Sequence, residues 1–183
     1  MSDLTRLSDL SKSISDQIHE ALPVLKECTS FAGRLDVEEL KRRSIQAPAI
    51  LVSRLRLVES KAYSGPTVTF DVSMAAFIVT KDRPGLTRDD AAANIASVLL
   101  SMIPERRWGL SWAGEADKVS EEPLISSGTR RDGVAISAVL WRQPITLTRQ
   151  EDPVETPIQL YLGTDPFAPS EGSGDYAPVG GDA

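Results

Sequence analysis

The sequence predicts an α+β fold, with an antiparallel or mixed sheet of about four strands and helices packed on one of its faces. Residues 67–80 have apolar side chains at every second position, which is the period of a strand with one buried face. Residues 87–103 have apolar side chains at the spacing of an amphipathic helix. The composition changes after Arg149, so we expect an α+β domain at residues 1–149 and a C-terminal arm at residues 150–183.

The N-terminal part is predicted to contain a helix, a short strand and a second, short helix. Residues 3–22 are the first helix, because leucine and isoleucine recur every three or four residues and a proline follows. Residues 26–34 are predicted to form a strand. Asp36 is placed to cap a helix at residues 36–44, whose basic residues near the end suit the helix dipole and need no ligand.

Residues 49–59 and 67–80 are predicted to form an antiparallel hairpin, because both have strand patterns and a short loop joins them. Four alternating residues of the first strand are expected on one side: Leu51, Ser53, Leu55 and Leu57. The second strand becomes apolar on both faces toward its end. We expect this end to be covered on both sides, by the chain itself or by a neighbouring subunit.

The long helix is predicted to begin after Thr87, which is its N-cap, with Asp90 three residues later as the cap partner. Pro104 ends it. Its apolar face is predicted to consist of Ala91, Ile95, Val98, Leu99, Met102 and Ile103.

Two further strands are predicted at residues 119–126 and 134–148. Pro144 lies inside the second of them. Because proline has no backbone N–H, it predicts that this strand is at an edge of the sheet or contains a bulge.

The arm at residues 150–183 differs from the domain in charge. It contains seven acidic residues and no lysine or arginine, so the domain has all 20 basic residues and the remaining 19 of the 26 acidic ones. A nearly neutral domain argues against a nucleic-acid-binding protein with a basic face. The single cysteine excludes an intrachain disulfide, and no signal peptide or membrane span is recognisable. We therefore expect a cytoplasmic protein without membrane contact.

The arm also combines prolines and glycines with apolar side chains, notably Leu160, Tyr161, Leu162 and Phe167. We expect residues 157–167 to form no helix or hairpin of their own and to lie extended across a neighbouring subunit or another protein. Residues 170–183 are expected to be disordered in isolation.

No arrangement of residues predicts a catalytic, cofactor or metal site. His19 is the only histidine and Cys28 the only cysteine, so a Cys/His metal site or a histidine-based triad lacks partners. The two acidic pairs have simpler explanations, a helix start and a solvated strand edge: Asp89 with Asp90, and Glu121 with Glu122.

One cluster is a candidate binding surface: Arg106, Arg107, Trp108 and Trp112. Such side chains stack on single-stranded bases, but they are also enriched in protein interfaces. Because the domain is nearly neutral, we predict a protein interface, with a core role for the cluster as the alternative. The interface is predicted to include four residues of the arm: Leu160, Tyr161, Leu162 and Phe167.

Four short strings resemble a known family. They are Pro48-Ala-Ile-Leu-Val, Pro84-Gly-Leu with Asn94 in the long helix, Trp108-Gly-Leu, and Gly133-Val-Ala followed by Val139, Trp141, Gln143 and Leu147. Over residues 1–149 the chain resembles, in the order of its elements, the Mu-like phage tail proteins classed with the tail terminators. The arm has no counterpart in the resemblance.

The resemblance implies a structural virion protein, not an enzyme, which is assembled in the host cytoplasm. Such proteins form a ring, commonly of six copies, at the head-proximal end of a long tail, where the ring stops polymerisation of the tube. The implied partners are further copies of the chain, the tail tube protein and the head connector or stopper protein. DNA passes through the ring without specific binding. Another neck or tail-tube component remains an alternative, as does a small cytoplasmic enzyme or regulator on the same scaffold.

Overall fold

The computed structural model describes residues 7–32, 45–61, 66–124, 133–148, 161–163 and 176–178. The chain divides into two compact units, Met1–Arg149 and Gln150–Ala183. This division falls where the composition of the sequence changes. The helix expected at residues 36–44 lies outside the described residues.

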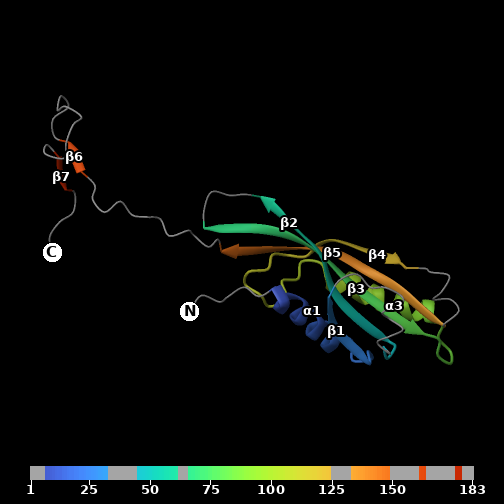
Figure 1. The fold of residues 1–183 in the computed structure, drawn as a ribbon. Helices are drawn as coiled ribbons and strands as arrows, with labels where there is room; N and C mark the ends of the chain where they lie inside the picture. Colours follow the sequence, from blue (N-terminus) through green and yellow to red (C-terminus); the bar gives the residue numbers. More distant parts are fainter. Residues whose placement is uncertain are drawn as a thin grey trace. The chain divides into compact units, whose positions relative to one another are not determined.

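The first unit contains a five-stranded sheet with the strand order β1-β2-β3-β5-β4 (Figure 1). The strands are β1 (Glu27–Ala32), β2 (Ala49–Lys61), β3 (Thr67–Lys81), β4 (Asp117–Pro123) and β5 (Val134–Thr148). β1 runs parallel to β2, and the other neighbouring strands are antiparallel. The predicted α+β class is therefore confirmed, as is the hairpin of β2 and β3, and the sheet is mixed. The strand expected at residues 119–126 begins and ends a few residues earlier than predicted.

Both described helices, α1 (Leu7–Ala21) and α3 (Arg88–Met102), cover the same face of this sheet (Figure 1). The largest buried cluster joins their inner sides to alternate residues of β3, because successive side chains of a strand point to opposite faces. Its central members are Leu10, Ile14, Ile18, Val72, Met74, Ile78 and Leu99. The helices are thus held by apolar burial on one side only.

The opposite face of the sheet has its own buried cluster, formed by β1, β2, β3 and β5 around Phe31, Leu51, Phe77 and Ile136. The end of β3 is therefore buried on both faces, as its sequence predicts. The chain itself supplies this burial, so no neighbouring subunit is needed for it.

A bulge in β2 changes the expected alternation of its side chains. The register against β3 shifts between Arg54 and Arg56, so Leu55 is the extra residue. Beyond the bulge, Leu57 lies with the helix-side cluster, whereas Leu51 and Leu55 lie with the opposite one. The prediction that Leu57 shares their side is wrong, because a bulge reverses the faces of the residues that follow it.

The buried side of α3 is also rotated from the predicted one. Ala92 and Ala96 are buried together with Ile95, Leu99 and Ile103. In contrast, the side chain of Val98, which was predicted to be buried, is 38 % exposed. Small alanines face the sheet here because the helix lies close to it, and the larger valine is left at the flank. The predicted cap is confirmed, since the Thr87 side chain accepts a hydrogen bond from the backbone N–H of Asp90 at 3.1 Å.

Pro144 does not place β5 at an edge. β5 lies between β3 and β4, and its register against β3 is continuous through Pro144. The Pro144 carbonyl accepts a hydrogen bond from Gly114 at 2.8 Å, on the side away from β3. Because the N–H and C=O of a strand residue point to the same side, the N–H that proline lacks would face this loop. The ladder with β3 therefore loses no bond.

In the second unit, β6 (Tyr161–Gly163) pairs antiparallel with β7 (Tyr176–Pro178). The prediction that residues 157–167 form no hairpin of their own is therefore wrong for these three residues. The backbone pairing satisfies hydrogen-bonding groups that an isolated extended segment would leave to water.

Candidate functional site

The predicted aromatic and arginine cluster lies in the loop between α3 and β4, and its first tryptophan is internal. The Trp108 side chain is only 2 % exposed and its indole N–H donates to the side-chain oxygen of Gln143 at 2.9 Å. Gln143 is fully buried and also accepts from the indole N–H of Trp141 at 3.3 Å. Its amide group donates to the carbonyls of Arg106 and Gly114 at 3.2 and 2.5 Å. The side chain of Gln143 in β5 thus holds the loop against this strand through hydrogen bonds to the Trp108 side chain and to the loop backbone.

The backbone of this loop has conformations that are rarely seen outside glycine. Glu105 and Trp108 have φ angles of 64° and 56°. For a bulky residue this region is strained, and such a conformation persists only where its surroundings enforce it. Burial of the indole and a hydrogen bond from the Ser13 hydroxyl to the Trp108 carbonyl, at 2.7 Å, provide that enforcement.

The Trp108 side chain therefore belongs to the core, which was the alternative prediction for the cluster. In the folded chain this side chain is not available to an interface. Trp112 is partly buried against the same core. Arg106 and Arg107 are exposed, and Arg107 pairs with Glu115 at 3.0 Å. Of the cluster, only the two arginines are thus exposed on the surface.

The four arm residues of the predicted interface are described only in part. Tyr161 and Leu162 belong to β6, of which the structure describes the backbone pairing. Leu160 and Phe167 lie outside the described residues. Their interface role stays a prediction.

The residues considered for chemistry lie apart. His19 is exposed on α1. Burial, with a smaller contribution from the charge of Asp16, raises the pKa of the Cys28 thiol to about 12, so this thiol is a poor nucleophile. Among the described residues, no three His, Cys, Asp or Glu side chains are grouped as metal ligands. Asp90 takes part in the cap of α3, where the Thr87 hydroxyl donates to its carboxylate at 2.6 Å.

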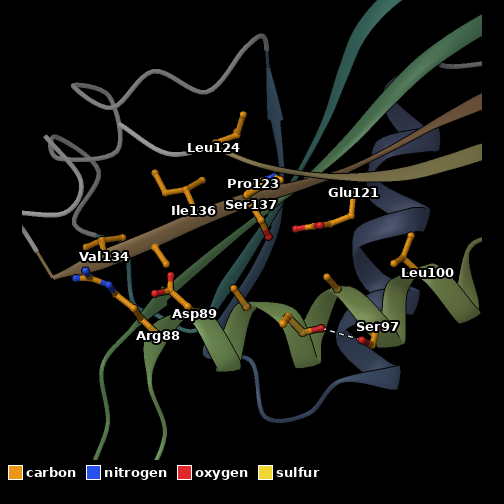
Figure 2. Close-up of a pocket in the computed structure, with 14 residues that line it drawn as sticks. Arg88, Asp89, Ser97, Leu100, Glu121, Pro123, Leu124, Val134, Ile136 and Ser137 are labelled. Atoms are coloured by element: carbon orange, nitrogen blue, oxygen red, sulfur yellow. Dashed lines mark hydrogen bonds between the residues drawn. The ribbon is translucent and has the colours of Figure 1, made fainter. Parts of the chain in front are cut away.

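Two hollows lie along the flanks of α3 in the described part of this unit. One is a groove of about 450 Å³ between α3 and strands β4 and β5, here called the β4-side groove. Its helix wall consists mainly of small side chains, and its other wall comes from the strands (Figure 2). Its lining includes Asp89, Ala93, Ser97, Leu100, Glu121 and Ser137.

Ser137 is the unusual residue of the β4-side groove. It is 4 % exposed, and its hydroxyl has no hydrogen-bond partner among the described residues. Figure 2 shows Ser137 and Glu121 reaching from the strands toward α3. A buried hydroxyl without a partner has a free-energy cost of about 1–3 kcal/mol, which a bound group can remove.

The second hollow is an apolar pocket of about 190 Å³ beside the turn that joins β3 to α3, here called the turn-side pocket. Two of its apolar side chains are unusually exposed, Val24 by 57 % and Leu86 by 39 %. Lys81 and Arg83 also line it. Three residues from two of the strings behind the family resemblance meet at this pocket: Pro48, Leu86 and Asn94.

The two hollows lie on opposite flanks of α3. Ala96 and Leu100, four residues apart, face the β4-side groove, whereas Ala91 and Asn94, three residues apart, face the turn-side pocket. Because an α-helix turns about 100° per residue, these two pairs point in nearly opposite directions. The helix therefore separates two surfaces of different shape.

These surfaces were missed in the sequence. The signal that could have pointed to them is the run of small residues from Ala91 to Ala93 with Ala96 and Ser97, of which the predicted apolar face included only Ala91. Small side chains on a helix allow close approach to one neighbour and leave space beside another. The sequence does not show which of the two occurs at each position.

Comparison with known proteins adds no family. The chain matches no protein-family model and no curated protein. In the part of the chain that the structure describes, no helix is both long and apolar enough to cross a membrane.

Proposed function

We propose that the chain is a structural subunit of a phage tail, which assembles into a ring of the tail-terminator type. The observation that carries the proposal is the presence of two unlike hollows, one with charged and polar residues in its lining and one mainly apolar, on opposite flanks of α3. A closed ring needs head-to-tail contacts, in which one surface of a subunit meets a different surface of the next. Two such surfaces on one rigid helix suit this geometry.

The resemblance to the tail terminators suggests where in the tail such a ring would lie. Residues from two of the strings that carry it, Pro48, Leu86 and Asn94, lie together at the turn-side pocket. A tail terminator sits at the head-proximal end of the tail, stops polymerisation of the tube and meets the head connector. Six copies are the expected number, and the assembled ring is a virion component.

The charge of the chain is compatible with a channel for DNA. The domain is nearly neutral and the arm is acidic, so neither would hold DNA tightly as it passes. The arm is proposed to reach a neighbouring subunit or the connector through its apolar residues. An enzyme on the same scaffold is the less favoured candidate, because the residues considered for chemistry lie apart.

The test is to purify the chain and to image it by negative-stain microscopy, alone and with tail tubes made from the tube protein of the same genome. The expected result is rings of about six copies, with one ring at one end of each tube. A chain that remains monomeric and does not bind tubes would contradict the proposal. Rings that build continuous tubes would favour a tail-tube component instead.

A further inference from the structure

We propose that the turn-side pocket surface of one copy docks into the β4-side groove of a second copy. In this contact the turn around Leu86 enters the groove, and Lys81 and Arg83 lie against Asp89 and Glu121 of the other copy. The inference rests on the proposed ring, and it names the two surfaces that form its contact.

The β4-side groove has the room and the chemistry for such an insert. Its volume of about 450 Å³ exceeds that of a cavity of roughly 150 Å³ that holds a benzene molecule, so it accepts more than one aliphatic side chain. Small side chains, Ala93 and Ser97, leave this space beside α3. The buried Ser137 hydroxyl needs a hydrogen-bond partner, which the polar groups of an inserted turn can supply.

The turn around Leu86 is a preformed element, and its apolar side chain is 39 % exposed at the rim of the turn-side pocket. Arg83 and Leu86 exchange two backbone hydrogen bonds of 3.1 Å each. Gly85, with a φ of 79°, allows the tight reversal between them. The Asp82 carboxylate accepts from the backbone N–H of Arg88 at 2.9 Å and ties the turn to the start of α3. A preformed turn loses little conformational entropy when it binds.

The charges at the two surfaces are complementary. Lys81 and Arg83 line the turn-side pocket, and neither forms an ion pair with the described part of the chain. Asp89 and Glu121 line the β4-side groove and are equally without an ion pair there. Arg88 also lines the β4-side groove, but it is paired with Asp82 at 3.8 Å. Opposite charges on two surfaces favour their association and fix its orientation.

A second copy fits better than an unrelated partner because both halves of the contact are present on each chain. The surfaces differ, so each bound copy still offers a free groove at one side and a free turn at the other. Repeated contacts of this kind close into a ring when the rotation between copies allows it.

The decisive experiment is a charge exchange, measured by analytical ultracentrifugation at low ionic strength, where electrostatic contacts are least screened. Arg83→Glu and Glu121→Lys are each expected to weaken self-association about tenfold or more. The double variant, in which the charges are exchanged, is expected to recover most of the association. Arg56→Glu, an exposed residue of β2 outside both surfaces, is the matched control and should have no effect.

A second variant tests the groove by shape. Ala93→Phe adds a large side chain at an exposed helix position that lines the groove, so self-association should be lost while the unfolding transition stays unchanged. The inference is overturned if the single charge reversals leave association unchanged or if the double variant fails to restore it. If the wild-type chain nevertheless forms rings that cap tubes, the proposed function stands and only the proposed contact between the two surfaces is wrong. If the wild-type chain neither associates nor binds tubes, the proposed function fails as well.

Discussion

The loop between α3 and β4 and the flanks of α3 are neighbours in the chain but opposite in character. The loop carries tryptophans and arginines, the residues most typical of interfaces, yet Trp108 is internal and Gln143 satisfies its indole N–H. The helix carries alanines and serines, yet its flanks border the two hollows. The residue types show which side chains tend to be buried. The surrounding packing decides whether these side chains are buried within the chain itself or stay exposed for a partner.

The largest effect that tests this difference is expected for Trp108→Ala. The change removes a buried indole and its hydrogen bond, and it should lower the free energy of unfolding by about 3–5 kcal/mol. Urea denaturation measures it. Trp112→Ala, at a partly buried position, is the comparison and should have a smaller effect. If the Trp108→Ala protein is as stable as the wild type but no longer self-associates, Trp108 is an interface residue and not a core residue.

A slightly smaller loss is expected for Gln143→Leu. The leucine leaves the indole N–H groups of Trp108 and Trp141 and the carbonyl of Gly114 without this partner, whereas the carbonyl of Arg106 still accepts from the backbone N–H of Ala116. A buried polar group left unpaired costs about 1–3 kcal/mol, and water that reaches the site lowers this cost. Urea denaturation should show a loss of at least about 2 kcal/mol. An unchanged midpoint would mean that water replaces the glutamine and that the loop is less closed than the hydrogen bonds indicate.

A buried and an exposed position of α3, both of which line the β4-side groove, can be compared with one pair of variants, Ala92→Leu and Ala93→Leu. Ala92 is 6 % exposed and packs in the core, so a larger side chain should cost about 1–3 kcal/mol of stability. Ala93 is exposed beside the groove, and its variant should be within about 0.5 kcal/mol of the wild type. Equal losses, measured by thermal unfolding, would show that the groove is filled in the folded chain.

The cap of α3 is expected to contribute about 1 kcal/mol, since Thr87→Ala removes the acceptor of the Asp90 N–H. Thr87→Ser keeps the hydroxyl and should retain most of the stability. The difference between the two variants in thermal unfolding isolates the cap. No difference would mean that burial of its inner side holds α3 in place without the cap.

The smallest effect is expected at the end of the loop, where Arg142 pairs with Asp117 and, at 3.0 Å, with Asp71. The hydrogen bond from Arg142 lowers the pKa of Asp117. The pair therefore stabilises the fold above the ordinary carboxyl pKa of about 4, and this stability is lost as the pH falls through the lower, folded-state value. Solvent screens a half-exposed pair, so the change is modest.

Unfolding measurements across this acidic range check the Asp117 prediction. Asp117→Asn should be less stable than the wild type at neutral pH and should approach it below the folded-state pKa. A constant difference at every pH would mean that the substitution acts through packing and not through the charge.

The sequence alone was sufficient to predict the elements whose signals are local. The alternation in β3, the cap at Thr87 and the hairpin of β2 and β3 each depend on residues close together in the chain, and the structure confirms them. The exposure of Val98 and the face of the sheet on which Leu57 lies were not predictable in this way. A bulge and the close approach of a helix to the sheet decide it, and both depend on the partner element.

Only the tertiary structure decided the strand order, the burial of Trp108 and the two hollows beside α3. Pro144 can occupy an interior strand because the side on which it lacks an N–H faces a loop and not β3. The backbone N–H of Gly114 in this loop, which comes from a distant part of the sequence, donates to the Pro144 carbonyl. Trp108 is buried because Gln143, 35 residues later, meets its indole. Contacts between distant residues leave no periodicity in the sequence, so the same residue types are compatible with a core and with an interface until the fold brings them together.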